Sequence, residues 1–191
     1  VLAFPGCSAL DLLAPSGAVR DIYDLQPVSL PAAGQRTSRR LMVLMPTAPA
    51  ALTTDRILIK ADPIVVSYLP EASWADSVPD MLQSLLIRST ASAGRLGFVG
   101  PQGAGPVPDT VLLTRIDAFE VTAQGDGRFV AQIALEMTVL RDRDQRVLGT
   151  RRFESALALP TDRAEVIARG FQQLLDDLLP AAASWVLARA A

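Results

Sequence analysis

The second half of the sequence alternates between apolar and polar side chains, and this pattern constrains the fold more than any other feature. From Phe129 to Val139 every second residue is apolar, and most residues between them are polar or small. Such alternation predicts a long strand with one buried face. A Gln-Gly-Asp-Gly turn sequence precedes this stretch and Asp-Arg-Asp-Gln follows it. The sequence therefore predicts a meander of three antiparallel strands, over 111–122, 129–139 and 147–159.

Shorter strands are expected in the first half of the chain, where apolar and β-branched runs end at turn-forming residues. These strands are predicted over 21–25, 41–45, 56–60, 64–68 and 96–99. The third and fourth flank Ala61-Asp62-Pro63, which favours a hairpin or one strand interrupted by a turn.

Two stretches have the periodicity of amphipathic helices. The apolar face of the first consists of Val78, Met81, Leu82, Leu85 and Leu86. Ser73 and Asp76 are its candidate N-caps, because a side-chain oxygen at that position can accept a bond from the first helical turn. Pro79 is tolerated at the start of this helix, and Gly94 suits its C-terminus.

The second helix is expected to begin after Thr161 or Asp162. Its apolar face consists of Ala164, Ile167, Phe171, Leu174, Leu175 and Leu178. Pro180 is expected to end or kink it, because proline cannot donate a helical hydrogen bond. Residues 181–191 then read as an apolar tail that carries Trp185. The predicted fold class is α+β: a mixed, mainly antiparallel β-sheet with two amphipathic helices packed on one face.

The composition excludes several classes of function. The 191 residues contain no histidine, which rules out His-based triads and His-containing zinc sites. The single cysteine rules out thiolate metal clusters, and the net charge of -2 argues against nucleic-acid binding. No serine or carboxylate pair forms a recognisable catalytic motif, and Arg151-Arg152 and 141–144 read as ordinary polar faces or turns. We therefore expect no enzyme, no cofactor and no metal site.

Three aromatic residues are the candidate partner contacts. Tyr68 and Trp74 flank the connector before the first helix, where they would either anchor a partner or fasten the helix to the sheet. Trp185 lies in the apolar tail, which with an exposed sheet edge is a candidate surface for self-assembly into a homo-oligomer. If so, deleting residues after Pro180 would weaken assembly without unfolding the core. The basic stretch 35–40 favours a solvated turn over a contact with anionic lipid headgroups.

The N-terminal sequence Val1-Leu2-Ala3-Phe4-Pro5-Gly6-Cys7 ends in the only cysteine of the chain. A short apolar run followed by a small residue and a cysteine is typical of the lipobox of a bacterial lipoprotein signal peptide. We interpret residues 1–7 as the remnant of that signal peptide and Cys7 as the lipidation site. The alternative is a lone apolar cysteine. Residues 8–40 then form a tether and first edge strand, and residues 41–191 form a single domain.

The sequence resembles the ABC-type transport auxiliary lipoprotein family. The resemblance is carried by Asp55-Arg56-Ile57-Leu58, by a strand that ends at Tyr68, and by Trp74-Ala75-Asp76 before the first helix. It implies a non-catalytic accessory subunit that works with an MCE-domain (mammalian cell entry) protein and ABC transporter subunits to move lipids across the bacterial envelope.

The resemblance also implies a location in the periplasm, with the lipid on Cys7 held in the inner leaflet of the outer membrane. Two alternative functions remain at this point. One is a periplasmic lipid carrier with its own apolar cavity, which the 50% hydrophobic content favours. The other is an envelope scaffold lipoprotein unrelated to transport.

Overall fold

The computed structural model describes residues 20–32, 34–62, 64–125 and 127–191, and it consists of one twisted sheet with two helices. The strands are β1 (Asp21–Tyr23), β2 (Arg40–Val43), β3 (Arg56–Asp62), β4 (Val65–Trp74), β5 (Phe98–Pro101), β6 (Thr110–Ala123), β7 (Phe129–Arg141) and β8 (Arg146–Leu159). The helices are α1 (Val78–Ser92) and α2 (Ala164–Ala190), and short 3₁₀ turns span Ala50–Leu52 and Asp142–Asp144.

Strand β6 is the centre of the sheet. One of its edges pairs antiparallel with β7 along its whole length, and β7 pairs in the same way with β8. Its other edge is shared, because the start of β6 pairs parallel with β2 and its end pairs parallel with β3. The β3–β4 hairpin, β1 and β5 complete the eight strands. The predicted meander and the mixed, mainly antiparallel sheet are both confirmed.

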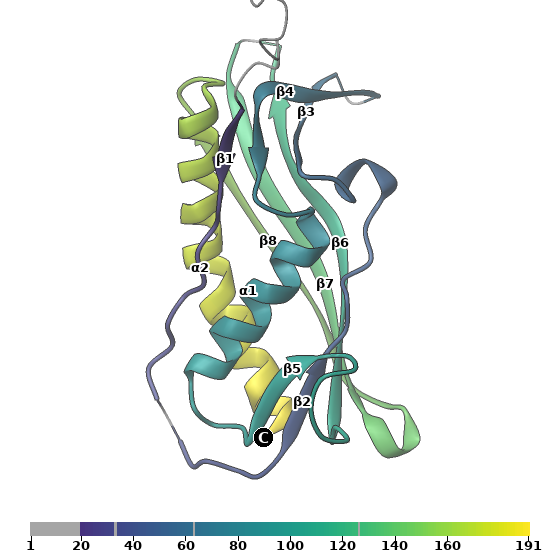
Figure 1. Ribbon diagram of the computed structural model, residues 1–191. Helices are drawn as coiled ribbons and strands as arrows, with labels where there is room; N and C mark the ends of the chain where they lie inside the picture. The colour runs from purple at the N-terminus through teal and green to yellow at the C-terminus, as the bar shows by residue number, and fades with distance from the viewer. Residues whose placement is uncertain (1–19, 33, 63, 126) are drawn as a thin grey trace, which may run out of the picture.

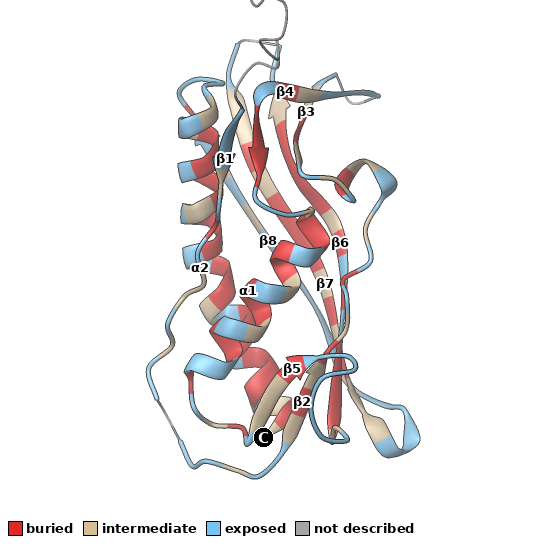
Figure 2. Cartoon of the chain, viewed as in Figure 1, coloured by how far each residue is buried: buried red, intermediate tan, exposed pale blue. Residues whose placement is uncertain are grey.

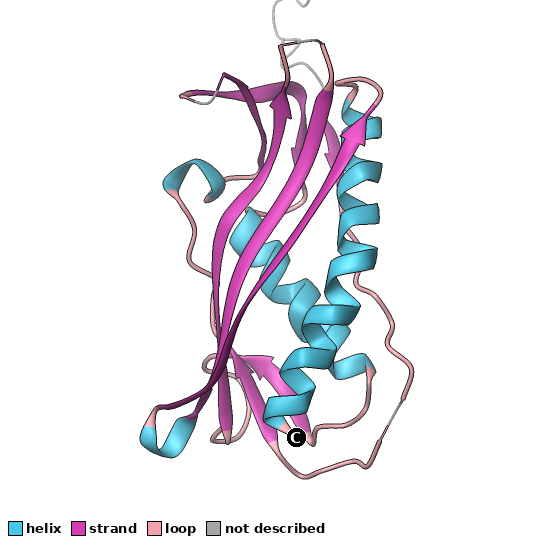
Figure 3. Ribbon diagram, turned by 180° about the vertical axis from the view of Figure 1, so that it is seen from behind, coloured by secondary structure: helices cyan, strands magenta, loops and turns pink. Residues whose placement is uncertain are grey.

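Both helices lie on the same face of the sheet, in front of it in Figure 1 and behind it in Figure 3. The alternation of β7 explains this arrangement. Ala131, Ile133, Leu135, Met137 and Val139 are all buried beneath the helices. Figure 2 shows the buried residues gathered between the two layers. The α+β fold class predicted from the sequence is therefore confirmed.

Three aromatic rings join the layers at the centre of the core. Phe119 of β6 stacks on Phe171 of α2, with ring centroids 4.5 Å apart. Trp74, at the end of β4, meets both rings edge-on at 5.8 and 5.4 Å. All three side chains are almost fully buried. Edge-to-face and offset contacts of this kind add to the stabilisation from burial alone, so this cluster fastens α2 to the sheet.

The segment after β1 packs against the helices, since its backbone is held by side chains of both. Gln26 donates its backbone N–H to Oε1 of Gln172 on α2 at 2.8 Å and accepts a bond from Nε2 of the same side chain. Val28 and Leu30 donate to Ser89 and Ser92 of α1 at 3.1 and 2.8 Å. These bonds provide partners for a backbone that crosses the helices without belonging to a strand.

Helix α1 begins later than the sequence indicated. Its N-cap is Ser77, whose Oγ accepts the backbone N–H of Asp80. The predicted caps were therefore wrong: Ser73 is a buried residue of β4, and Asp76 precedes the cap. Long-range pairing explains the difference, because Trp74 is aligned with Tyr23 of β1 and donates its backbone N–H to Asp55. Those bonds keep the chain extended through residue 74.

Helix α2 does not end at Pro180. It continues to Ala190, so residues 181–190 are helical and not a separate tail. Figure 3 shows the helix changing direction part-way along its length, as expected where a proline interrupts the helical hydrogen bonds. Beyond Pro180 it buries Ala182, Ala183, Trp185, Val186, Leu187 and Ala190. The free energy gained by burying these side chains therefore outweighs the cost of the hydrogen bond that Pro180 cannot donate within the helix.

Candidate functional site

The residues singled out from the sequence do not form one site. Cys7 lies outside the described residues. Trp74 is 2% exposed in the aromatic cluster. Trp185 is 6% exposed and packs edge-on against Phe153 of β8, with the Arg189 guanidinium 4.5 Å from its ring centroid. Both tryptophans therefore serve packing inside the chain, and contact of either with a partner stays a prediction.

Tyr68 is the most accessible of the three aromatic residues. Its hydroxyl donates to the backbone carbonyl of Ala51 at 3.1 Å, and the Arg56 guanidinium lies 5.5 Å from its ring centroid. These contacts tie β4 to β3 and to the 3₁₀ turn before it. The structure thus shows a local packing role for Tyr68, and its contact with a partner also stays a prediction.

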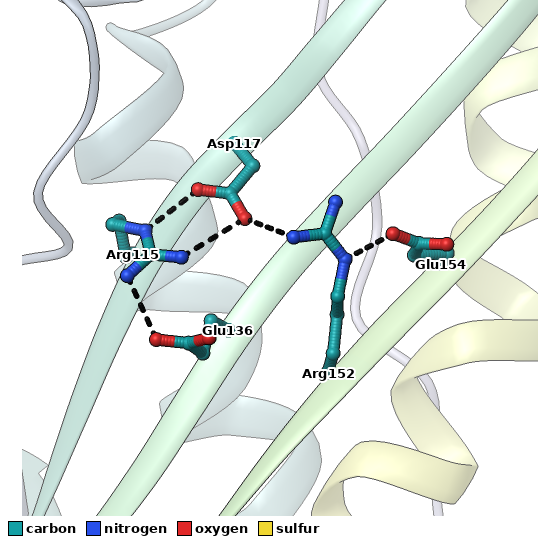
Figure 4. A network of polar contacts seen from close by, with 5 residues as sticks. All are labelled: Arg115, Asp117, Glu136, Arg152 and Glu154. Atoms are coloured by element: carbon teal, nitrogen blue, oxygen red, sulfur yellow. Dashed lines mark hydrogen bonds and ion pairs between the residues drawn. The ribbon is translucent and has the colours of Figure 1, made fainter.

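The sheet face opposite the helices carries a network of five charged side chains, drawn in Figure 4. Arg115 of β6 binds Asp117 through two contacts of 2.7 and 3.2 Å and binds Glu136 of β7 at 2.7 Å. Arg152 of β8 binds Asp117 at 2.7 Å and also contacts Glu154. Two guanidinium groups and three carboxylates are thereby connected across three strands.

The register of the meander brings these residues together. Arg115, Glu136 and Arg152 are direct neighbours on β6, β7 and β8. Asp117 occupies a bulge in β6 between Ile116 and Ala118, where the register with β7 shifts by one residue. A bulge commonly redirects a side chain, and here the Asp117 carboxylate lies between both arginines.

Hydrogen bonding holds the network in its charged form. The Arg115 side chain lowers the pKa of Asp117, chiefly through their hydrogen bonds, and the charge of Arg152 adds to the effect. The same bonds raise the pKa of Arg115. The contacts among the five side chains fix them in place. Such preorganised arginines and carboxylates favour specific recognition of a protein surface.

Two hollows flank the network, and each is lined partly by apolar residues and partly by charged side chains of the network. A hollow of about 340 Å³ extends over Ala118, Ala134 and Ala156 on one side. On the other side a hollow of about 300 Å³ is lined in part by Met45 and Leu113, both exposed apolar residues. Protein interfaces are enriched in arginine and methionine and combine apolar patches with a polar rim. We name this face, with its network and two hollows, the open-face surface.

Sequence reasoning missed this surface. The polar residues were visible as alternate positions of the strands, but Arg151-Arg152 read as an ordinary polar face. The spacing of residues within one strand does not show which residues of the neighbouring strands lie beside it. It also does not show the bulge at Asp117. Within the described ranges, no three potential metal-ligating side chains cluster together. In that same part of the chain, no helix has the length and apolarity needed to cross a membrane.

Comparison with known proteins agrees with the resemblance found in the sequence. A family model described as the ABC-type transport auxiliary lipoprotein component matches residues 23–183. The crystal structure of protein XCC0632 from Xanthomonas campestris is similar to this chain with a TM-score of 0.79 and 25% identity. The match covers 88% of this chain and 96% of that one. None of the curated proteins matches this sequence.

Two more distant structures share the fold. An uncharacterized protein is 16% identical over 88% of this chain and 99% of its own, with a TM-score of 0.67. The hypothetical protein CT253 from Chlamydia trachomatis is 10% identical over 80% of this chain and 99% of its own, with a TM-score of 0.52. At these identities the likeness concerns the fold alone.

Proposed function

The chain belongs to the ABC-type transport auxiliary lipoprotein family, and on that premise we propose that it is a non-catalytic accessory subunit of an MCE-type transport system that moves lipids. The observation that carries the proposal is the open-face surface, which offers a prearranged charged network beside two hollows that are partly apolar. An accessory subunit needs such a surface to dock on another subunit. The occupant we propose is the MCE-domain protein of the system.

We also propose that acylation of Cys7 anchors the domain to a membrane. Arg20, where the described chain begins, lies thirteen positions after Cys7 in the sequence. A fully extended chain of this length spans about 45 Å at 3.3–3.6 Å per residue. Acyl chains on Cys7 would therefore keep the domain within about this distance of the membrane. We propose the inner leaflet of the outer membrane as the site of the anchor, with the domain in the periplasm.

The alternative function of a lipid carrier requires an apolar cavity between the helices and the sheet. The rings of Trp74, Phe119 and Phe171 are packed together at the centre of that layer, which favours the accessory function over this one. The scaffold alternative differs in its partners, which would be cell-wall components and not transporter subunits. Identification of the partners therefore decides between transport and scaffolding.

Replacing Ala156 with arginine tests the docking surface. Ala156 is exposed on β8 and lines the hollow beside Arg152 and Glu154. A long side chain there fills the hollow without disturbing the core. We expect capture of transporter subunits from crosslinked native membranes to fall by about tenfold or more, the effect of disrupting an interface centre. Mass spectrometry of the captured proteins measures this loss.

A matched control is Ala91→Arg, which places the same side chain on the exposed face of α1. This variant should capture partners as well as the unaltered protein does, and thermal unfolding of both variants should match that of the unaltered chain. Equal capture by Ala156→Arg would show that the partner binds elsewhere. Capture of cell-wall proteins alone by the unaltered protein would favour the scaffold function.

Substitution Cys7→Ser tests the anchor. Stable attachment requires more than one acyl chain, and serine cannot be acylated through a thioether. We expect the variant to leave the membrane fraction and appear in the soluble periplasmic fraction, with its unfolding transition unchanged. Fractionation followed by immunoblotting measures the distribution. If Cys7→Ser stays with the membrane when transporter subunits are absent, a site other than Cys7 holds the protein there.

A further inference from the structure

Arginine residues gather at one end of the molecule although the whole chain has a net charge of -2. This end holds the start of β2, the β5 strand, the β7–β8 turn and the C-terminus of α2, and it lies at the bottom of Figure 1. Its arginines include Arg39, Arg40, Arg141 and Arg143, which line one groove, with Arg146 at the start of β8 and Arg189 in the last turn of α2. Its acidic residues among the described segments are Asp109, Asp142 and Asp144. We name this region the basic end.

A groove of about 560 Å³ crosses the basic end. It is lined by Arg39, Arg40, Val107, Pro108, Asp109, Arg141, Asp142 and Arg143. Two of its arginines are fixed by carboxylates. Asp109 binds Nε of Arg40 at 3.0 Å and its backbone N–H at 2.9 Å, and Asp144 binds Arg141 at 2.9 and 2.8 Å.

The other two arginines of the groove have guanidinium groups available for a ligand. Arg39 and Arg143 are exposed, and within residues 20–32, 34–62, 64–125 and 127–191 neither guanidinium makes a hydrogen bond or ion pair. A guanidinium presents a planar fork of donors that matches phosphate oxygens. The groove therefore combines two fixed arginines with two that can close on an anion.

An apolar residue stands at the same groove. Val107 lines it and is 73% exposed. A cationic groove with an exposed apolar side chain suits a lipid headgroup, where a phosphate adjoins apolar material, better than it suits free phosphate or an acidic peptide. The arginines together with the exposed Val107 side chain therefore indicate a phospholipid headgroup as the ligand.

From these features we propose that the groove at the basic end binds the phosphate of an anionic phospholipid headgroup. The proposal deepens the proposed function and rests on it for the orientation of the domain. β1 begins at the opposite end of the sheet (Figure 1), and the 14-residue strand β6 spans about 45 Å between the ends at 3.3 Å per residue. A domain tethered through Cys7 can thus present its basic end to lipid far from its own anchor.

The test uses the full chain with Cys7→Ser, so that acyl chains make no contribution, and vesicles of phosphatidylcholine with or without phosphatidylglycerol. The variant Arg39→Gln/Arg143→Gln removes both available guanidinium groups. Co-flotation with the anionic vesicles should fall by about 30-fold, because each arginine near an anionic surface changes partitioning by about fivefold. Vesicles of phosphatidylcholine alone should bind neither protein.

The matched control is Arg20→Gln/Arg163→Gln, which removes two exposed arginines at the other end of the molecule. It should retain binding to the anionic vesicles. If both double variants lose vesicle binding equally, the loss comes from the change in net charge and not from the groove, and the proposal is overturned. Binding of inorganic phosphate in calorimetry without binding of vesicles would overturn the commitment to lipid.

A further outcome separates this proposal from the proposed function. If Arg39→Gln/Arg143→Gln loses capture of transporter subunits while vesicle binding is unchanged, the groove contacts an acidic protein and the lipid proposal fails. If the unaltered protein captures no transporter subunit but binds anionic vesicles through Arg39 and Arg143, the accessory function fails and the lipid groove stands.

Discussion

Replacing Phe171 with alanine is expected to lower the free energy of unfolding by about 3–5 kcal/mol, the usual cost of removing a fully buried phenylalanine. Its ring stacks on Phe119 and meets Trp74 edge-on, so the change leaves a cavity where α2 contacts the sheet. The neighbouring backbone belongs to a long helix and a paired strand, and neither can collapse into the space without breaking other contacts. Urea unfolding followed by tryptophan fluorescence measures the loss.

Phe129→Ala is the matched control for this prediction. Phe129 lies at the start of β7 and is only half-buried. Its removal should cost clearly less than the loss at Phe171, because much of its ring already contacts water. A loss at Phe129 as large as that at Phe171 would contradict the view that the aromatic cluster is the centre of the core.

The main features of the fold could be predicted from local patterns. The alternation from Phe129 to Val139 gave β7 its buried face, and the Gly-containing turn before it became a tight connection, with Gly127 at a φ of 80°. The periodicity of α1 likewise identified its buried face. These features depend on residues close together in the sequence, where the pleat of a strand or the pitch of a helix sets the pattern directly.

The start of α1 could not be predicted, because distant segments decide it. β4 contains an irregular stretch in which Glu71 has a φ of 56°, and the strand then resumes pairing through Trp74. Ser73 and Asp76 were chemically suitable caps, but pairing of residues 72–74 with β1 kept that segment in the sheet. Local propensity is a weak guide when a tertiary contact competes with it.

The open-face surface illustrates the same limit at the level of function. Arg115 and Arg152 are 37 positions apart in the sequence, and they share the Asp117 carboxylate only because β7 aligns β6 with β8. The bulge that positions Asp117 adds one residue to β6 without a local signature. The network thus depends on how the three strands are aligned. The sequence pattern of a single strand does not determine that alignment.

Ending the chain at Pro180 is expected to prevent stable folding. The removed segment, residues 181–191, contributes six buried side chains, including Trp185, Val186 and Leu187. Fully burying one large aliphatic side chain contributes about 1.5–3 kcal/mol, and loss of a buried tryptophan costs about 3–5 kcal/mol. Together these losses are comparable with the whole net stability of a typical domain, about 5–15 kcal/mol. We expect the truncated chain to lose its cooperative unfolding transition in circular dichroism.

Trp185→Ala distinguishes a core role of this segment from a role in assembly. The variant keeps the helix and loses only the ring between Phe153 and Arg189, so it should fold with reduced stability and remain soluble. If the truncated chain instead unfolds at the same urea concentration as the full chain and loses only its oligomeric state in light scattering, the segment serves assembly and its packing against β8 is dispensable. Burial of six side chains from one helical segment favours the first result, because a surface used only for assembly would lie exposed in the single chain.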